Sequence, residues 1–222
     1  MNRKIILTDD GSHTVQLDDS KEHYHSTFGA IQESMHIFIN HGFKHLSPAI
    51  DNIQIFEVGF GTGLNAFMTY LQTIDKDIFV NYTAIEAFPL DKEIYSELNY
   101  HKLLKSGEGE RMFALMHDAP WNQLFFLSPK FALTKVQSKI EDFDLSNKYH
   151  IIYFDAFDPE YQPELWTESI FNKMYKMLEP GGIIITYCAK GKVKRAMKSA
   201  GFKIEELPGP PGKREITRGY KL

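Results

Sequence analysis

The glycine-rich segment at residues 57–63, which reads EVGFGTG, constrains the fold of this chain more than any other feature. An apolar run at 53–58 precedes it, and the apolar residues Leu64, Phe67 and Leu71 follow at helical spacing. Glycines between a strand and a helix let the backbone approach a ligand closely and point free N–H groups at it. The order strand, glycine turn, helix is therefore typical of an α/β fold that binds a nucleotide-like ligand.

The rest of the chain repeats this alternation of strands and helices. Further apolar strand patterns lie at 78–85, 131–136, 151–154 and 183–187, and helical patterns follow Pro89, start at Pro163 and surround Val193. Two strand-like segments at the end, 202–207 and 215–220, are joined by a Pro- and Gly-rich turn. The pattern predicts a doubly wound, mostly parallel sheet that ends in an antiparallel hairpin, with its ligand crevice at the carboxyl ends of the strands.

The first 50 residues predict a smaller layer in front of this core. Residues 4–17 alternate around a turn at Asp9-Asp10-Gly11, which indicates a β-hairpin. Ser26 is expected to cap a helix that ends at His41-Gly42. We therefore expect a single domain over 1–222: an N-terminal hairpin and helix layer at 1–50, and a Rossmann-like core at 51–222 with an insertion around 100–130.

Composition excludes several classes of function. The net charge is −4, so any contact with RNA must come from a local basic patch. No segment approaches the roughly 20 apolar residues of a membrane helix, and no signal-peptide pattern opens the chain, so a cytoplasmic protein without membrane contact is expected. Cys188 is the only cysteine, and the histidines lack metal-ligand spacing, so no metal is expected.

The spacing of the glycines narrows the choice of cofactor. A dinucleotide fingerprint needs a third glycine where this chain has Leu64. Glu86 ends the second strand, where a carboxylate can accept hydrogen bonds from both hydroxyls of a ribose. A nucleoside cofactor without a pyrophosphate fits this arrangement. The alternative is structural: the glycines form a tight corner, and Glu86 is an ordinary surface acid.

Asp155 follows directly on the fourth main strand, so its carboxylate is expected at the strand tip, facing the crevice. There it could hold an amine, orient it and accept its proton. Phe157 and Pro159 are expected to form an apolar wall around the acceptor. The alternative role for Asp155 is to cap the following loop, since Asp readily bonds nearby backbone N–H groups.

Several stretches together resemble one known family. They read FEVGFGTGLN at 56–65, EAFPL at 86–90, YFDAFDP at 153–159 with PELWT at 163–167, TYCAKG at 186–191 and GPPGKRE at 209–215. The first is similar to motif I of class I methyltransferases. As a set they resemble the methyltransferase half of the bifunctional tRNA wobble-uridine enzyme MnmC and its stand-alone form, MnmD. The resemblance runs from about Tyr24 to the end of the chain.

The resemblance implies a Rossmann-like class I methyltransferase that uses S-adenosyl-L-methionine. Its reaction would convert 5-aminomethyl-2-thiouridine at the tRNA wobble position to the methylaminomethyl form. At the positions that match the family's motifs, the residues expected to bind the cofactor are Glu57, Gly59, Gly61, Gly63, Asn65 and Glu86. Asp155 would face the amine. No flavin is expected, because the oxidase half of the bifunctional enzyme has no counterpart here. Ser138-Lys139 replaces the Gly-Asp usual in bifunctional relatives, so Ser138 or the backbone would contact the adenine.

The C-terminal third is locally basic and is the expected tRNA contact. Lys190, Lys213 and Arg214 are the residues expected to bind phosphates beside a splayed-out wobble base. A solvated charged face is the alternative reading. Two rival functions also stay open: methyl or aminopropyl transfer to a small free amine, and a non-catalytic RNA-binding module that keeps a vestigial cofactor fold.

Overall fold

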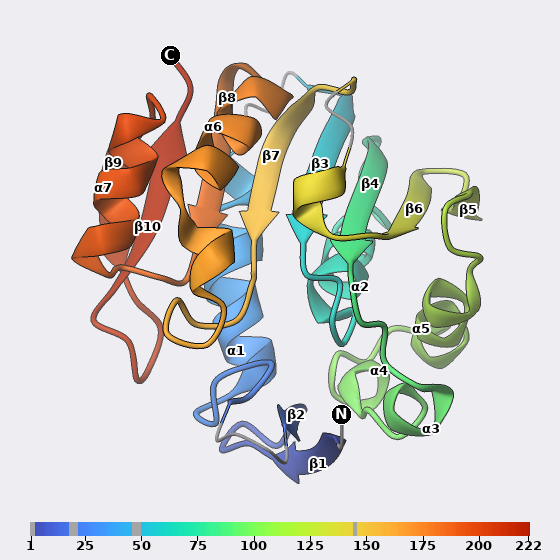
Figure 1. Ribbon diagram of the computed structural model, residues 1–222. Coiled ribbons are helices and arrows are strands. Elements are labelled where there is room, and N and C mark those ends of the chain that lie inside the picture. The colour runs from blue at the N-terminus through green and yellow to red at the C-terminus, as the bar shows by residue number, and fades with distance from the viewer. Residues whose placement is uncertain (1–2, 18–21, 46–49, 144–145) are drawn as a thin grey trace.

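The structure, a computed structural model, describes residues 3–17, 22–45, 50–143 and 146–222, and in these it contains an eight-stranded sheet (Figure 1). Its strands are β3 (Asn52–Val58), β4 (Phe79–Glu86), β5 (Leu124–Ser128), β6 (Phe131–Gln137), β7 (Tyr149–Phe154), β8 (Leu178–Thr186), β9 (Lys203–Pro208) and β10 (Glu215–Tyr220). The strand order is β5-β6-β4-β3-β7-β8-β10-β9. Strands β6, β4, β3, β7 and β8 run parallel, and β9–β10 form an antiparallel hairpin. The predicted fold class is confirmed.

Helices cover the two faces of the sheet. One face carries α1 (Ala30–Ser34) with its π-helical continuation η1 (Met35–Asn40), α2 (Leu64–Leu71) and α5 (Gly109–Asp118), and the other carries α6 (Glu168–Met177) and α7 (Gly191–Ser199). In Figure 1, α6 and α7 lie in front of the sheet, and α1 and α2 lie behind it. The shorter elements are η2 (Phe43–His45), α3 (Lys92–Tyr95), α4 (Tyr100–Leu103), η3 (Ile140–Asp142) and η4 (Pro163–Trp166).

Alternation along the central strands divides the core in two. On β7, Ile151 and Tyr153 belong to the core beneath α2, whereas Ile152 and Phe154 belong to the core beneath α6. All four are fully buried. Successive side chains of a strand point to opposite faces, so a continuous apolar run is what a strand covered on both faces requires.

A two-stranded hairpin closes the end of the sheet at which the parallel strands finish. It consists of β1 (Arg3–Leu7) and β2 (His13–Leu17), and the arrowheads of β3, β4 and β7 point toward it in Figure 1. Asn99 holds the hairpin in place: its Oδ1 accepts from the His13 N–H at 2.9 Å, and its Nδ2 donates to the Gly11 carbonyl at 2.8 Å. The predicted hairpin therefore forms one wall of the crevice region.

The first helix begins later than the sequence predicted. Ser26 caps no helix; its hydroxyl accepts from the Phe28 N–H within a turn, and α1 starts at Ala30. The caps come from the β1–β2 turn, because Ser12 Oγ accepts from the Ala30 N–H at 3.1 Å and Asp10 Oδ2 accepts from the Gln32 N–H at 2.9 Å. A cap supplied from a distant segment leaves no local pattern for a sequence to show.

Two further differences concern the sheet. Part of the predicted insertion around 100–130 joins the sheet as β5, which pairs antiparallel with β6 at its edge. The strand expected at 183–187 begins earlier, at Leu178, so residues 179–182 lie within β8, where the pairing with β7 shifts register between Tyr149 and Ile151. A bulge of this kind accommodates extra residues without ending the strand.

Arg218 on β10 ties the last hairpin to the N-terminal layer. Its side chain is buried, its Nη1 donates to the His41 carbonyl at 2.8 Å, and its Nη2 donates to Glu205 Oε2 at 2.6 Å. Tyr220 also donates to Glu205 Oε2, at 2.6 Å. Arg218 therefore has a structural role between η1 and the β9–β10 hairpin.

We expect Arg218→Leu to lower the free energy of unfolding by about 2 kcal/mol, because it removes charge-assisted hydrogen bonds from a buried site. Urea unfolding measures the difference. Arg214→Leu is the matched control, since the Arg214 side chain is 94% exposed and its loss should leave stability nearly unchanged. Equal stability of the two variants would contradict the structural role of Arg218.

Candidate functional site

A cavity of about 600 Å³ opens at the carboxyl ends of β3, β4 and β7. Its walls come from the glycine turn, the segments that follow β4, β6 and β7, the segment between β2 and α1, and the loop before β10. The volume falls within the range of small-molecule sites, roughly 300–1,000 Å³. The position agrees with the crevice expected for a doubly wound sheet, beside the switch point between β3 and β7.

The glycine turn depends on backbone conformations and spacings that favour glycine. Gly59, Gly61 and Gly63 have φ angles of 88°, 50° and 72°. A Cβ atom on Gly59 would lie 2.7 Å from the Asp155 carbonyl oxygen, and one on Gly61 would lie 3.0 Å from the Tyr24 ring. The turn is thus packed between the end of β7 and the N-terminal layer, while Gly59 and Gly61 line the cavity.

The Glu86 carboxylate is fixed by two backbone donors. Its Oε2 accepts from the Gly61 N–H at 3.0 Å, and its Oε1 accepts from the Phe88 N–H at 2.8 Å. Each carboxylate oxygen has two acceptor positions, so both oxygens keep capacity for a further donor. Glu86 lines the cavity with that capacity intact, as the pairing of a carboxylate with a vicinal diol requires.

Asn65, in the first turn of α2, bridges two carboxyl groups. Its Nδ2 donates to Glu57 Oε1 at 3.0 Å and to Asp155 Oδ2 at 2.8 Å. Glu57 is fully buried beneath the cavity, whereas Asp155 is partly buried and lines it. The amide therefore fixes the Asp155 side chain from below and leaves its other oxygen for the cavity.

Burial dominates the acid–base properties of both acids. Burial, reinforced by the Glu33 carboxylate, raises the pKa of Asp155 to about 7, although hydrogen bonding from Asn65 and the charge of Lys213 oppose the rise. Burial and the neighbouring Asp155 raise the pKa of Glu57 well above its ordinary value. Burial thus favours the protonated form of Glu57, and Asp155 exchanges a proton near neutrality.

A lysine and three aromatic rings complete the surroundings of Asp155. Lys213 Nζ lies 4.8 Å from the centroid of the Tyr187 ring and 3.3 Å from Glu33 Oε1. Lys213, Glu33 and Tyr187 all line the cavity. On the other side, the Tyr24 and Phe157 rings meet edge-on with centroids 4.9 Å apart. The site thus combines a proton-accepting carboxyl with an aromatic wall.

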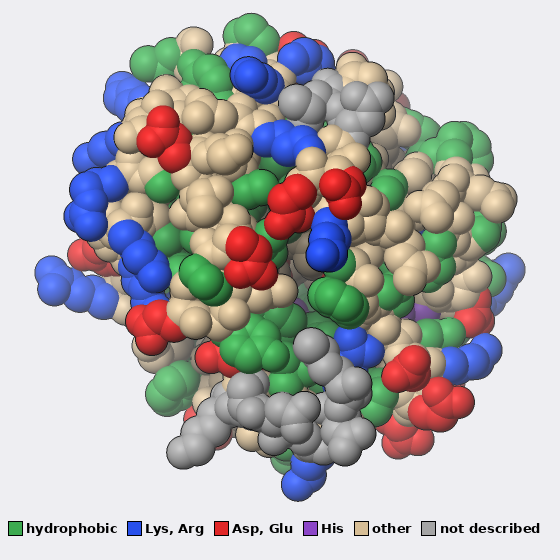
Figure 2. All heavy atoms as spheres, in the orientation of Figure 1, with side chains coloured by type: hydrophobic (Ala, Val, Ile, Leu, Met, Phe, Trp, Pro, Cys, Tyr) green, Lys and Arg blue, Asp and Glu red, His purple; other side chains and the backbone are tan. Residues whose placement is uncertain are grey.

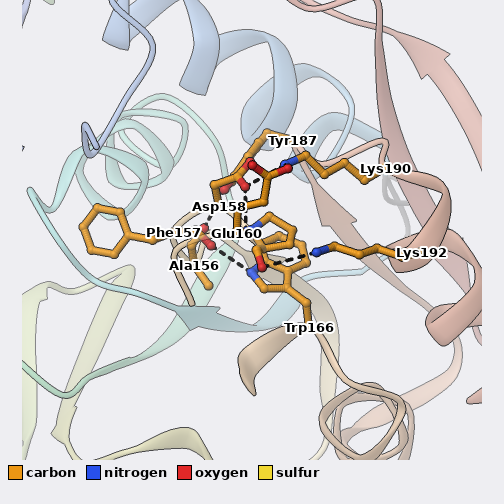
Figure 3. Close-up of polar contacts among 9 residues, drawn as sticks. Ala156, Phe157, Asp158, Glu160, Trp166, Tyr187, Lys190 and Lys192 are labelled. Atoms are coloured by element: carbon orange, nitrogen blue, oxygen red, sulfur yellow. Dashed lines mark hydrogen bonds and ion pairs between the residues drawn. The ribbon is translucent and has the colours of Figure 1, made fainter. Parts of the chain in front are cut away.

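The segment after Asp155 is rigidly held (Figure 3). Trp166 Nε1 donates to the Phe157 carbonyl at 2.8 Å, and the Tyr187 hydroxyl donates to the Ala156 carbonyl at 2.9 Å. Lys190 Nζ lies 2.7 Å from Asp158 Oδ1 and 2.8 Å from Glu160 Oε1. In Figure 3 the Phe157 ring points away from this cluster, so the contacts fix the backbone and leave the ring free for the cavity.

The structure brings most of the candidate residues to the cavity. Those that line it are Gly59, Gly61, Asn65, Glu86, Ser138, Asp155, Phe157 and Lys213. Glu57 and Gly63 lie behind the lining, Glu57 under Asn65 and Gly63 as the residue that precedes α2. Pro159 is buried outside the lining, and its carbonyl accepts from Lys192. Lys190 and Arg214 also lie outside the lining.

Sequence reasoning missed several residues of the cavity. Tyr24, His25 and Glu33 come from the N-terminal layer, and Tyr187 and Glu141 follow other strands. His25 Nε2 lies 2.7 Å from Thr62 Oγ1, so this layer also contacts the glycine turn. Glu141 lies three residues after Ser138 and offers an acidic group in that region. Tyr24-His25-Ser26 stands at the start of the stretch that resembles the family, and this position is the sequence signal that could have identified these cavity residues.

Comparisons with known proteins agree with this geometry. A family model described as S-adenosyl-L-methionine-dependent methyltransferase matches residues 126–222. The tRNA 5-methylaminomethyl-2-thiouridine biosynthesis bifunctional protein MnmC of Leptospira borgpetersenii is 30% identical over 206 residues, which cover 88% of this chain and 32% of that protein. The MnmC of Chromobacterium violaceum is 25% identical over 209 residues, with 89% and 32% covered. The chain is therefore similar to S-adenosyl-L-methionine-dependent methyltransferases.

Solved structures support the same fold. MnmC2 from Aquifex aeolicus superposes with a TM-score of 0.78 at 22% identity, covering all of this chain and 70% of the other. Spermidine synthase from Thermotoga maritima superposes with a TM-score of 0.55 at 15% identity, covering 98% and 68%. These likenesses concern the fold alone. The chain spans about a third of the length of the curated relatives it matches.

S-adenosyl-L-methionine is the family's cofactor, and the residues of the cavity fit it. Glu86 offers acceptors for the ribose, and Asn65 Oδ1 is buried without a hydrogen-bond partner. An unpartnered buried acceptor suits an ammonium group such as that of the cofactor's amino-acid end. In the part of the chain that the structure describes, no cluster of acidic, histidine or cysteine side chains could hold a metal ion, and no helix is long and apolar enough to cross a bilayer.

The raised pKa of Glu57 leads to a test by an isosteric substitution. We expect Glu57→Gln to bind S-adenosylhomocysteine within about threefold of the wild-type affinity, since glutamine reproduces a protonated glutamate and still accepts from Asn65. Isothermal calorimetry at pH 7.5 measures this. Glu57→Ala, which removes the acceptor, should weaken binding by about tenfold, the equivalent of one buried hydrogen bond. An equal loss in both variants would show that the negative charge is required.

Proposed function

We propose that this methyltransferase transfers the methyl group of S-adenosyl-L-methionine to the primary amine of 5-aminomethyl-2-thiouridine at the wobble position of tRNA, giving 5-methylaminomethyl-2-thiouridine. The names of the MnmC relatives support this substrate. The single observation that carries the chemistry is the Asp155 carboxyl, which lines the cavity at the end of β7 with a pKa of about 7.

The cofactor supplies the methyl group, and the chain must supply a free amine. An alkylamine in water is protonated at neutral pH, and its nitrogen then has no lone pair to react. Asp155 accepts a hydrogen bond from the ammonium, removes one proton and orients the nitrogen. Asp155 then releases this first proton to solvent and is ionised again. When bound, the cofactor would supply the methyl group to the nitrogen lone pair, with its sulfur keeping the electron pair of the methyl–sulfur bond, and the second proton lost by the nitrogen would leave through Asp155 to solvent. Asn65 keeps the carboxyl in place.

The aromatic wall suits a flat pyrimidine. Phe157 meets Tyr24 with centroids 4.9 Å apart and Tyr161 with centroids 5.6 Å apart, and all three residues line the cavity. Unstacked bases of single-stranded RNA are commonly bound by stacking on aromatic side chains. A wobble uridine turned out of the anticodon loop would place its 5-substituent toward Asp155 and its ring against this wall.

The structure changes the choice of residues for the phosphates. Lys190 is ion-paired with Asp158 and Glu160, and Lys213 points into the cavity, so neither presents a free cation to a phosphate. Lys192, Arg195 and Lys198 are exposed and recur every three residues along one face of α7. Figure 2 shows Lys and Arg side chains gathered along this edge of the molecule. We propose that this face of α7 binds the anticodon-stem phosphates, with Arg214 beside it.

A second candidate function is methylation of a small polycationic amine. The cavity is lined by several acids, among them Glu22, Glu33 and Asp158, and such a lining suits a ligand with two or more ammonium groups. Methylation of free polyamines but not of tRNA bearing the aminomethyl group would favour this candidate.

We expect Asp155→Asn to lower the rate of methyl transfer at saturating substrate by about a hundredfold, the lower end for loss of a general base. Its affinity for S-adenosylhomocysteine should change less than threefold, because asparagine keeps the acceptor that Asn65 uses. Single-turnover methylation with labelled cofactor and tRNA lacking the final methyl, followed by nucleoside analysis, measures the rate. Equal loss of rate and cofactor affinity would indicate a structural role.

The same pair of proteins should differ in pH dependence. The pKa of Asp155 is raised from 3.8 to about 7, so its carboxylate is mostly protonated at pH 6 and mostly ionised at pH 8. The wild-type rate should therefore rise with pH, with its midpoint near pH 7, and level off above about pH 8. Asp155→Asn should lack this inflection, and an identical inflection in both would assign it to another group.

For the tRNA surface, we expect Lys192→Ala, Arg195→Ala and Lys198→Ala together to weaken tRNA binding and flatten its salt dependence. Each lost phosphate contact should reduce the log–log slope by roughly 0.7–0.9 units. Filter binding between 50 and 300 mM KCl measures the slope. Lys76→Ala with Lys130→Ala is the charge control, since both lie at the opposite end of the sheet. An equal effect of this control would exclude specific binding by α7.

A further inference from the structure

Lys135 is a buried cation held by aromatic rings. It lies on β6 and is 1% exposed. Its ammonium is 4.7 Å from the centroid of the Trp121 ring and 5.4 Å from that of Phe60, and it donates a hydrogen bond to the carbonyl of His117. That carbonyl belongs to the last turn of α5, where a positive charge is favoured by the helix dipole.

This arrangement is costly for folding. No carboxylate of the described residues lies within ion-pairing distance of Lys135, whose contacts are the two rings and one carbonyl. Burial lowers the pKa of Lys135 to about 8. An apolar side chain at the same place would avoid the desolvation of a charge. A buried lysine without an acidic partner therefore calls for a role other than stability.

The groups that Lys135 contacts also hold the glycine turn. Phe60 lies between Gly59 and Gly61, and the Phe60 and His117 rings meet with centroids 5.4 Å apart. His117 Nε2 donates to the Thr62 carbonyl at 3.0 Å. Lys135 thus reaches the turn by two routes, directly through Phe60 and through the end of α5. Lys135 does not line the cavity, so any effect on a ligand passes through these neighbours.

We propose that Lys135 is a positioning residue for the cofactor: its ammonium holds Phe60 and the end of α5 together and so fixes the glycine turn against the cavity. The attraction between a cation and an aromatic face is lost when the lysine is neutral or absent. The inference rests on the family's cofactor and is independent of the tRNA substrate.

The charged neighbours of Lys135 set the direction of its pH dependence. Asp118 attracts a proton to Lys135, but it is engaged by Tyr95 and Lys92 from the α3 side. Burial lowers the pKa of His117 to about 3, so His117 stays neutral across the working range. Within the described residues the other neighbours, Phe60 and Trp121, do not titrate. Cofactor affinity should therefore fall as pH rises through about 8.

Stability should respond in the opposite sense. The pKa of Lys135 is lower in the folded chain, about 8, than its ordinary 10.5, so between these pH values the unfolded chain binds more protons. The contribution of Lys135 to stability then rises with pH, and at neutral pH its charge opposes folding. A variant with an apolar residue should consequently be no less stable than the wild type while binding cofactor more weakly.

The test compares the wild type with Lys135→Met and Lys130→Met, the latter a half-exposed lysine preceding the same strand. The ligand is 5′-methylthioadenosine, a nucleoside without the amino-acid end. It carries no ammonium group, so no ammonium of the ligand titrates in this pH range. Calorimetry at intervals from pH 6.5 to 9.5 gives affinities, and thermal unfolding gives stability. We expect Lys135→Met to bind about tenfold more weakly at pH 7 with no pH dependence near 8, and to melt no lower than the wild type.

Each outcome decides the question. An affinity and pH profile in Lys135→Met that match the wild type would overturn the inference, as would a weaker affinity accompanied by a proportional loss of stability. Lys130→Met should retain the wild-type profile, and the same change in that variant would also count against Lys135. Failure of the wild type itself to bind the nucleoside would instead remove the cofactor site and with it the proposed function.

Discussion

The close approach of the ends of β3 and β7 is the constraint on which the rest of the site depends. The parallel register pairs Val58 with Phe154, so the next residues, Gly59 and Asp155, lie side by side. The Asp155 N–H donates to the Val58 carbonyl at 3.0 Å, and there is no room for a Cβ atom between Gly59 and the Asp155 carbonyl. One backbone contact thus joins the cofactor turn to the carboxyl proposed to handle the amine.

Around this contact acidic side chains outnumber basic ones. Glu57 and Asp155 share one amide donor, Asn65, and Glu33 lies close enough to raise the pKa of Asp155. Lys213 is the nearby cation, and it divides its charge between Glu33 and the face of Tyr187. Burial, reinforced by this imbalance, raises the pKa of Glu57 well above its ordinary value and the pKa of Asp155 to about 7, where a carboxyl can accept and release a proton efficiently. The excess of acidic side chains also suits a cationic substrate, which supplies the missing positive charge when it binds.

Much of this arrangement could be predicted from the sequence, because it follows from local patterns. The alternation of strand and helix predicted the sheet, and strand-tip positions predicted that Glu86 and Asp155 would share a crevice, which they do. Contacts between distant segments could not be predicted in this way. The helix caps of α1 come from Asp10 and Ser12, and the extra strand β5 exists through its pairing with β6. The partners of Lys190 and Lys213 likewise depend on acids that only the fold brings near.

By itself, the sequence determined the order of strands and helices, the glycine turn and the family, since these depend on the spacing of neighbouring residues. Only the tertiary structure decided which charges are free. A lysine looks the same in a sequence whether it is exposed on α7 like Lys192 and Lys198, paired like Lys190, or buried between rings like Lys135. The reason is physical: the free energy of a charge is set by the solvent and partners around it, and folding supplies both from segments far apart in the chain.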